Sequence, residues 1–478
     1  MGKAKLAIPI FGKMATRSFH TAQFRETLEQ HGFEPLYFIG PHYFRNVDLD
    51  RYRYFELETV QYEAMFERHA LLRALALLRR FVVRTDTTDL RFRESIEARL
   101  FDFGPVAKTW IYAACMDLLR RIPGLGHLAA WSENALFPTH VHDGALKNQA
   151  VDCVLTPGAG NYGFWNEGFF AREAKGLGLP VFAAITNYDN IVNMGFRGFM
   201  PDGLAVWSQQ MANEAMRLQR IPASRIEITG PVQYDRYFVP LPISREEFLR
   251  SKGLDPARKT ILFAGGVNIT RYFEFYRLLT GVMQSGSNLL HNVVVRPYPH
   301  VKLLASPGWQ VLEGLFARTE GVYLSNPLNT SSDNLASDEL QRDLGLSERV
   351  DELYCLLQYS DVMINYFSTI SLEAAICDLP VIHIGYDVYT FGHRYNTSAA
   401  FQQRQTHNRR DLRLAAARIA KDEADLVKFI DLYLEDRTLD REARYEYALS
   451  ECGYLDGLSS KRLALMLQNR ICSLNHGQ

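Results

Sequence analysis

VMINYFSTISLEAAICDLPVIHI, residues 362–384, is the stretch of sequence that decides the fold. It opens with an apolar run typical of a buried strand, Val362–Tyr366, and passes through small residues with helical spacing. A second apolar run, Val381–Ile384, follows directly after a proline. The pattern predicts a strand–helix–strand unit of a parallel sheet.

The start of the short helix is the first candidate site. Ser368 is a favourable N-cap, and the free N–H groups of the first turn, with the helix dipole, attract an anion. Thr369 and Glu373 are four residues apart and share a helix face, so a phosphate held at the start would leave Glu373 near a ribose. An ordinary capped helix with a surface glutamate is the alternative, and spacing alone gives both equal weight.

Composition indicates a globular chain in which any anion site must be local. The 478 residues suffice for two to three domains, and 47% hydrophobic content supports full cores. Lys+Arg 53 against Asp+Glu 54 give a net charge of -1, which argues against nucleic acid as partner. Six scattered cysteines without CxxC pairs, no signal peptide and no long apolar window predict a cytoplasmic protein.

The N-terminal half opens as a doubly wound sheet does. Lys5–Phe11 reads as a strand in which Pro9 indicates an edge position or an early end, and Leu36–Ile39 reads as a second strand. Between them, Gly12–Arg17 is expected to be a flexible basic loop beyond the carboxyl end of the first strand. Ligands bind at that edge of such sheets, so Lys13 and Arg17 are candidate acceptor contacts.

Residues 50–138 interrupt the alternation with helical patterns and are predicted to form an insertion. Its leucines are flanked by arginines, which allows a surface helix on an anionic membrane. The alternative, which we favour, is a helix packed on the sheet with arginines at its margin. The arginines concerned are Arg68, Arg73, Arg79, Arg80, Arg120 and Arg121.

Four further strands then deliver polar loops to one edge of the same sheet. They are predicted at 152–155, 181–185, 204–207 and 226–229. The loops that follow the first two carry the candidates for the chemical step or for acceptor contact, which are Asn161, Tyr162, Glu167, Asn187 and Asp189.

A second alternation begins after a proline-rich crossing. Its first strand, Thr260–Ala264, precedes Gly265, Gly266 and Asn268, whose backbone can approach donor phosphates closely. Strands are also expected at 292–295 and 322–324, and residues 418–469 are expected to be helical. We therefore expect an N-terminal domain at 1–238, a C-terminal domain at 239–440, and helices at 441–478 that cross back. The cleft between two such halves is the default active site.

The order of these elements resembles a GT-B glycosyltransferase. The resemblance is carried by ITGPVQYDRY (228–237), ILFAGG (261–266), VVRPYPH (294–300), NYFSTISLEAAICDLPVI (365–382) and YLDGLSSKRLALML (454–467). More narrowly, it is to bacterial transferases of capsule, lipopolysaccharide or teichoic acid synthesis. It implies two Rossmann-like domains that face each other, a nucleotide-sugar donor on the second, an acceptor on the first, and transfer without a metal or other cofactor.

The resemblance also assigns residues. Ser368 and Thr369 match the phosphate-binding helix start, with Ser371 beside them, and Glu373 matches the acidic residue that holds the ribose. Arg296 matches a basic residue before a His-Pro pair, but Tyr298 stands in the histidine place and His300 follows instead, which argues against a CMP-linked donor. Tyr386, in the loop after Val381–Ile384, is a candidate to stack on the base.

Inverting transfer needs a base for the acceptor hydroxyl, for which Asp189 is the first choice, ahead of Glu167 and Asn187. An Asp in a turn rich in Asn can equally serve its own backbone. The predicted partners are a nucleotide-sugar donor, a glycan or lipid-linked acceptor and, peripherally, the inner membrane face. The other functions open on this scaffold are a sugar-nucleotide epimerase or hydrolase of the UDP-GlcNAc 2-epimerase kind, and a polyol-phosphate transferase of the CDP-glycerol type.

Overall fold

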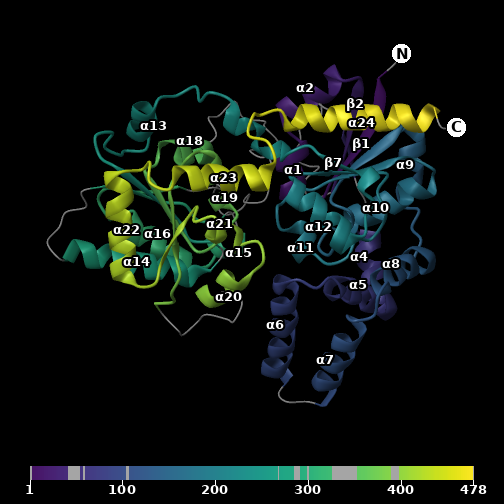
Figure 1. Ribbon diagram of the computed structural model, residues 1–478, viewed down its shortest axis with the longest axis horizontal. Helices are drawn as coiled ribbons and strands as arrows, with labels where there is room; N and C mark the ends of the chain where they lie inside the picture. Colours follow the sequence, from purple (N-terminus) through teal and green to yellow (C-terminus); the bar gives the residue numbers. More distant parts are fainter. Residues whose placement is uncertain are drawn as a thin grey trace. The chain divides into compact units, whose positions relative to one another are not determined.

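The computed structural model describes residues 3–40, 54–56, 60–103, 107–266, 268–284, 291–298, 301–325, 352–388 and 398–476. The chain divides into two compact units. The first contains the residues up to Phe238 and those from Ser450 onward, and most of Val239 to Leu449 forms the second. Each unit has a parallel sheet with helices around it, as Figure 1 shows, so the predicted pair of doubly wound α/β halves is confirmed.

The first unit contains a sheet of seven described strands in the order β3-β2-β1-β4-β5-β6-β7, and all its recorded pairings are parallel. The chain order reverses between β1 and β4, which lie side by side, so this is the switch point of the sheet. The strands are β1 (Ala4–Ile10), β2 (Phe33–Ile39), β3 (Tyr54–Glu56), β4 (Cys153–Pro157), β5 (Val181–Ala184), β6 (Gly203–Val206) and β7 (Ile226–Ile228).

The edge position that Pro9 suggested for the first strand is wrong. β1 lies inside the sheet, between β2 and β4. Its pairing with β4 is recorded at Leu6 and Ala7 and with β2 as far as Ile10. Proline is tolerated at position 9 because β4 is no longer paired with β1 there.

The basic loop expected at 12–17 is also wrong, since the chain is helical from Lys13. Helix α1 (Lys13–Phe19) places Ala15 and Phe19 in the core, and Thr16 Oγ1 donates to the Gly12 carbonyl at 3.2 Å. A second helix, α2 (Ala22–Gln30), begins at the N-cap Thr21. Ala15 and Phe19, four residues apart, are buried on the same side and stabilise helix α1. Gly12 and the basic residues had suggested a loop instead.

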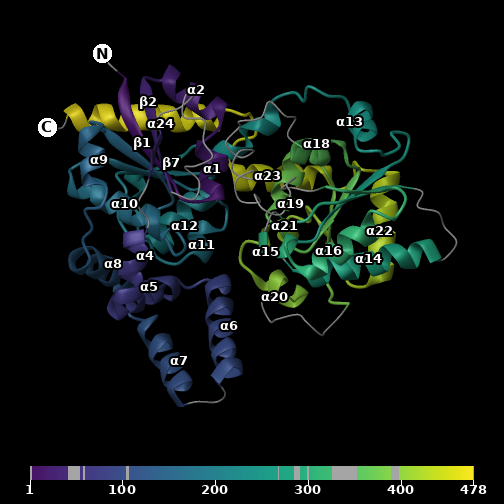
Figure 2. The same ribbon diagram turned by 180° about the vertical axis from the view of Figure 1, so that it is seen from behind.

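Of the insertion predicted at 50–138, Tyr54–Glu56 is instead strand β3 of the sheet. The other described residues contain five helices, α4 (Val60–Arg68), α5 (Ala70–Val82), α6 (Asp86–Phe103), α7 (Ala107–Leu119) and α8 (Leu125–Leu136). Figures 1 and 2 show α6 and α7 side by side, extending away from the sheet of the first unit. Arg79 and Arg120 are buried rather than marginal; Arg79 is paired with the buried Glu133 and Arg120 with the partly exposed Asp89.

The remaining helices of the first unit cover its sheet. They are α9 (Asp143–Asn148), α10 (Trp165–Gly176), α11 (Asn190–Asn193), α12 (Gln209–Gln219) and the closing helix α24 (Ser459–His476). Helix α24 buries Leu463, Met466 and Leu467 in the core of the first unit. The Asp235 carboxylate accepts the N–H groups of Ser459 and Ser460 at 2.9 and 2.7 Å, which caps the start of α24.

The second unit contains a sheet of six described strands in the order β10-β9-β8-β11-β12-β13, again with parallel pairings. Its switch point lies between the neighbours β8 and β11. The strand β13 was missed, because residues 418–469 were predicted to be helical and its three residues are too few for a recognisable pattern. The strands are β8 (Thr260–Ala264), β9 (Asn292–Val295), β10 (Val322–Leu324), β11 (Val362–Asn365), β12 (Val381–Ile384) and β13 (Arg418–Ala420).

The helices of the second unit are α13 (Arg245–Ser251), α14 (Ile269–Gln284), α15 (Val301–Leu304), α16 (Pro307–Phe316), α18 (Glu352–Tyr359), α19 (Ile370–Ile376), α20 (Ala399–Arg404), α21 (Arg410–Arg413), α22 (Glu423–Glu435) and α23 (Arg441–Cys452). Most of α23, up to Leu449, belongs to this unit. Arg444 holds it there by an ion pair with Asp378 at 2.7 Å. Within the described residues, no helix has the length and apolarity needed to cross a membrane.

Candidate active site

The switch point of the second sheet brings two predicted donor loops together. Asn365, the last residue of β11, is paired with Ala264, the last residue of β8. The chain therefore continues from neighbouring points into Gly265-Gly266 on one side and Tyr366–Thr369 on the other. Open α/β sheets bind ligands beyond the carboxyl ends of their strands at such a point.

A buried network shapes the turn between β11 and α19. Phe367 adopts a left-handed conformation, with φ of 53°, and donates its N–H to Asn365 Oδ1 at 3.1 Å. His383, on the neighbouring strand β12, stacks on the Phe367 ring and has Nδ1 2.6 Å from Asn365 Oδ1. Its Nε2 lies 2.6 Å from Asp411 Oδ2. The turn is thus fixed from two strands and from α21.

The helix start differs in detail from the expectation. Thr369, not Ser368, occupies the N-cap position, and its side chain caps no N–H group. Both side chains are half-buried, and neither hydroxyl makes a hydrogen bond to any described residue. Two hydroxyl groups are therefore available to a ligand beside the turn.

Two other residues assigned to this helix point into the protein. Ser371 is buried, and its hydroxyl accepts a hydrogen bond from Asn365 Nδ2 at 2.8 Å. Glu373 is 4% exposed, so the alternative of an ordinary surface glutamate is wrong. Its contact with a ribose stays a prediction.

The glycine loop after β8 is held by one tyrosine. Tyr272 Oη donates to the Gly266 carbonyl at 2.7 Å and accepts the Tyr298 N–H at 3.1 Å, so it joins the loops after β8 and β9. A Cβ at Gly265 would lie 2.8 Å from the Tyr272 ring, and Gly266 has φ of +75°. Both positions therefore require glycine. The Asn268 side chain accepts the Thr270 N–H at the start of α14.

Arg296 is engaged inside the second unit. Its guanidinium donates to Ser325 Oγ at 2.7 Å and pairs with Glu352 at 3.1 Å. Lys252 binds the same carboxylate at 2.7 Å. Burial opposes the charge of Glu352, but hydrogen bonds from Lys252 and Ser325 and the charge of Arg296 outweigh burial and hold its pKa at about 2. A phosphate at Arg296 would have to compete with Glu352.

The last two residues assigned to the donor have different outcomes. Tyr386 packs against the core of the second unit, and its hydroxyl is buried without a partner among the described residues, so burial raises its pKa. This position does not favour stacking on a base. His300 lies outside the described residues.

The glycine turn after β4 lies at the switch point of the first sheet. Asn161 is buried and donates Nδ2 to the Gly195 carbonyl at 2.8 Å, and the Tyr162 N–H donates to the Met194 carbonyl. Arg80, from the insertion, lies over the Tyr162 ring at 4.2 Å and donates to its hydroxyl. Both predicted acceptor residues are thus tied into the fold, while Lys13 and Arg17 lie on α1 after β1.

Glu167, in the first turn of α10, is a buried carboxyl group. It is 5% exposed, and burial raises its pKa to about 8. No side chain in the described part of the chain donates to it; the contact that lowers its pKa is with its own backbone N–H. A buried carboxyl group that holds its proton near neutral pH, at the start of the helix that follows β4, is a candidate general acid or base.

Asp189 and Asn187, after β5, serve their own loop. Asp189 is buried and accepts a hydrogen bond from Asn193 Nδ2 at 2.9 Å and a longer one from Asn190. Asn187 Oδ1 accepts the Tyr188 N–H at 3.0 Å. The alternative considered for Asp189, a bond to its own backbone, is not seen among the described residues; its donors are the side chains of Asn190 and Asn193.

The sequence analysis did not predict a buried pair of arginines, Arg79 and Arg172, near the glycine turn after β4. Glu133, from α8, binds Arg79 Nε at 2.6 Å and Arg172 at 2.7 Å, and Arg79 also donates to the carbonyls of Gly160 and Phe196. The insertion thereby supports the glycine turn. The sequence did contain a signal for this cluster, because Arg79 lies within the apolar helix α5, and an arginine buried there requires a carboxylate partner.

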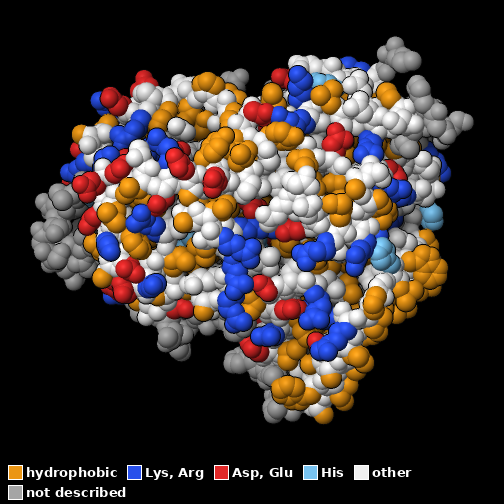
Figure 3. All heavy atoms as spheres, viewed as in Figure 1, with side chains coloured by type: hydrophobic (Ala, Val, Ile, Leu, Met, Phe, Trp, Pro, Cys, Tyr) orange, Lys and Arg blue, Asp and Glu red, His pale blue; other side chains and the backbone are white. Residues whose placement is uncertain are grey.

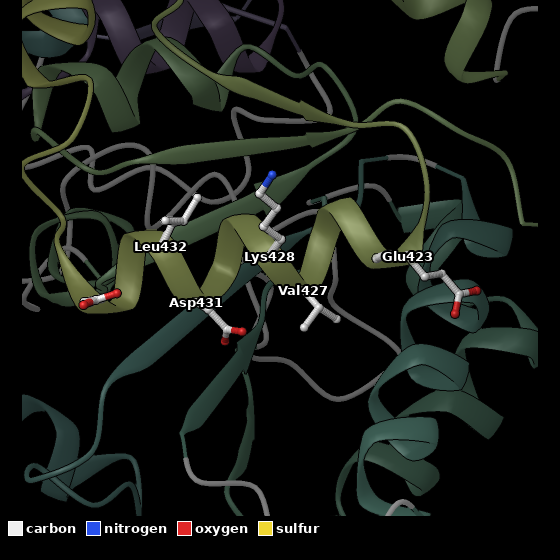
Figure 4. A pocket seen from close by; sticks show the side chains of 7 residues that line it. Glu423, Val427, Lys428, Asp431 and Leu432 are labelled. Carbon is white, nitrogen blue, oxygen red and sulfur yellow. The ribbon is translucent and has the colours of Figure 1, made fainter.

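A surface depression of about 700 Å³ lies elsewhere on the second unit, along α22. Figure 4 shows Val427 and Asp431 extending to one side of the helix and Lys428 to the other. Its lining comes from α22 alone, namely Glu423, Ala424, Val427, Lys428, Asp431, Leu432 and Glu435. Because these polar groups do not converge, the depression adds no chemistry to the site.

The comparisons with known proteins identify the fold. No family model and no curated protein matches the sequence. Similar solved structures include a UDP-N-acetylglucosamine 2-epimerase (14% identity, TM-score 0.53, covering 100% of this chain and 97% of that one). Another is the UDP-GlcNAc 2-epimerase of Methanocaldococcus jannaschii in complex with UDP-GlcNAc and UDP (12% identity, TM-score 0.51, covering 97% of this chain and 99% of that one). A third is the UDP-GlcNAc 2-epimerase of Neisseria meningitidis bound to UDP-GlcNAc (11% identity, TM-score 0.50, covering 97% of this chain and 100% of that one). The chain has the fold of these proteins, the GT-B fold predicted from its sequence.

Proposed function

We propose that the protein is an enzyme that acts on a nucleotide-activated sugar and transfers the sugar to a glycan or lipid-linked acceptor. The observation that carries this proposal is the pair of loops at the switch point of the second sheet. There, Gly266 and the unengaged hydroxyls of Ser368 and Thr369 follow the neighbouring strands β8 and β11.

The chemistry of this edge suits a diphosphate. No backbone hydrogen bond engages the N–H groups of Thr369 and Ile370 among the described residues, so they can donate to phosphate oxygens together with the two hydroxyls. Gly266, with open space where a Cβ would be, leaves its backbone accessible to a ligand. These donors would stabilise the charge that develops on the leaving nucleotide.

We assign the proton transfer to Glu167 ahead of Asp189. A base must deprotonate the acceptor hydroxyl, and a pKa near the working pH makes that group most effective. The pKa of Glu167 is about 8, whereas the Asp189 carboxylate accepts hydrogen bonds from its neighbours. Lys13 and Arg17, after β1, remain the proposed acceptor contacts.

A sugar-nucleotide epimerase or hydrolase is the second candidate. The three solved structures named above are epimerases, two of them with UDP-GlcNAc bound, and they support this reading through the fold. The helical insertion favours transfer, since a lipid-linked acceptor needs a surface that an epimerase does not.

Thermal melting with UDP, CDP, GDP, CMP and UDP-GlcNAc tests the donor site. A nucleotide at 100 times its Kd should stabilise the protein by about 2.7 kcal/mol. Ser368→Ala combined with Thr369→Ala should remove the shift. A matched pair on the same unit, Ser251→Ala with Thr280→Ala, should retain it, because these hydroxyls bond to helix carbonyls. A shift that survives in the first double variant would refute the assignment.

Product analysis separates the two candidates. A transferase should leave its nucleotide-sugar intact until an acceptor extract is added. An epimerase or hydrolase should change the sugar or release the nucleotide in buffer alone, and that result would replace our first proposal with the second.

A further inference from the structure

Helix α7 carries apolar side chains on two faces. Tyr112, Met116 and Leu119 face α6, where they meet Phe92 and Ile96. Along the other face, Trp110, Ile111 and Leu118 are 56% to 66% exposed, and Ile122, in the turn just after the helix, is 45% exposed. The three helical residues are spaced with the helical period, so they share one face of α7.

Helix α8 repeats the arrangement. Gly126 packs so closely that a Cβ there would lie 2.9 Å from the Phe196 ring, and Ala129, Ala130 and Glu133 are buried on the same side. The opposite side presents three exposed large apolar residues, Leu128, Trp131 and Leu136.

Together these seven residues form what we call the outward surface: Trp110, Ile111, Leu118, Ile122, Leu128, Trp131 and Leu136. Figure 3 shows hydrophobic side chains along the edge of the first unit over α7 and α8. A contiguous apolar surface of this kind marks a docking site, because burying it in water-free surroundings is favourable.

We propose that the outward surface docks the protein on an anionic lipid bilayer. Two indoles among aliphatic side chains match the boundary between headgroups and acyl chains. Residues 60–137 contain eleven Lys and Arg against nine Asp and Glu, whereas the whole chain has a net charge of -1. Arg84 and Arg93 are exposed in this region and can meet lipid phosphates.

The charged groups of α7 and α8 support a bilayer as the occupant. Glu133 and Arg120 are turned inward and paired, and Arg121 is bonded to Asp117 one turn back. The outward surface therefore presents large apolar groups, and Asp117, the half-exposed acidic side chain of α7, is paired with Arg121. No described helix could span a membrane, so α7 and α8 would lie on the bilayer. This inference does not depend on the proposed function, although it would bring a lipid-linked acceptor within reach.

Co-sedimentation of the full chain with vesicles tests the proposal. The probes are vesicles of phosphatidylcholine alone and vesicles with 30 mol% phosphatidylglycerol. The wild type should sediment with the anionic vesicles and less with the neutral ones. The fluorescence of Trp110 and Trp131 should move to shorter wavelength on binding, and this shift should be lost in Trp110→Phe with Trp131→Phe.

The deciding variant combines Trp110→Gln, Ile111→Gln and Leu118→Gln. These side chains are exposed, so the fold should persist and the partition onto anionic vesicles should fall at least tenfold. A matched control removes three exposed apolar side chains from the second unit, Val311→Gln, Val427→Gln and Tyr445→Gln, and should bind as the wild type does.

Three results would overturn the proposal. They are no binding to either vesicle, equal binding by the Trp110 variant and the wild type, or a wild-type dimer in ultracentrifugation that the variant abolishes without any vesicle binding. The last would make the outward surface an interface between copies. The Trp110, Ile111 and Leu118 variant should show the same nucleotide-induced melting shifts as the wild type. The melting assay therefore tests the donor proposal independently of the vesicle assay.

Discussion

Replacing Glu167 by glutamine should change the pH dependence of stability. The carboxyl group is buried at the start of α10, and its pKa is raised to about 8 from an ordinary value of 4.5. Glutamine keeps the shape and the neutral charge of the protonated acid but cannot titrate. The substitution therefore isolates the effect of one proton.

The sign follows from the two pKa values. Below pH 4.5 the group is protonated in both states and has no effect. Between pH 4.5 and about 8 the unfolded chain loses the proton and the folded chain keeps it, so stability falls as pH rises. At about 1.4 kcal/mol for each pKa unit, the wild type should lose about 2.5 kcal/mol between pH 5 and pH 7 because of this group.

Urea unfolding at pH 5, 6 and 7, followed through tryptophan fluorescence, to which the buried Trp207 of the first unit contributes, measures the difference. The free energy of unfolding of Glu167→Gln, relative to the wild type, should rise by about 2.5 kcal/mol over this range. Glu313→Gln, an exposed glutamate of α16, is the control and should show no such rise. A constant difference between Glu167→Gln and the wild type would mean that the folded carboxyl is ionised, and Glu167 would lose its assignment as the acid or base.

Two further substitutions test the buried charges. Glu133→Ala leaves Arg79 and Arg172 without their carboxylate and should lower the free energy of unfolding in urea by about 3–5 kcal/mol. The control Glu97→Ala, at an exposed position, should lower it little. A loss below about 1 kcal/mol in Glu133→Ala would contradict the pairing. Glu352, with a pKa of about 2, stabilises the second unit above pH 4.5, and about 2 kcal/mol should be lost as pH falls from 5 to 3. In Glu352→Gln, urea denaturation curves should not show this loss of unfolding free energy between pH 5 and pH 3. A variant that loses as much as the wild type over this range would refute the low pKa of Glu352.

The fold could be predicted because its signals are local. Apolar runs bounded by glycine, proline and caps placed most of the strands, and the unit at 362–384 was confirmed as β11, α19 and β12. The errors have tertiary causes. Pro9 lies in an interior strand because its neighbour stops pairing there, α1 forms because Ala15 and Phe19 are buried, and β13 exists through its pairing with β12.

The candidate site was less predictable, because partners distant in sequence decide what each side chain can do. Arg296 was a reasonable phosphate ligand until Glu352, 56 residues away, proved to bind it. Asn161 and Tyr162 looked like acceptor contacts, but the carbonyl of Gly195 and Arg80 of the insertion hold them. Sequence spacing places residues at a sheet edge, and it does not reveal which of them remain free.

The turn at Phe367 is held in place where we propose that the donor binds. A bulky residue at φ of 53° is strained, and such strain persists only where the surroundings fix it. Asn365 and His383 do so from two adjacent strands, and Asp411 holds the imidazole from behind. The hydroxyls of Ser368 and Thr369 follow this fixed turn, so a phosphate would meet donors that need little reordering, which is the condition for electrostatic stabilisation of a leaving group.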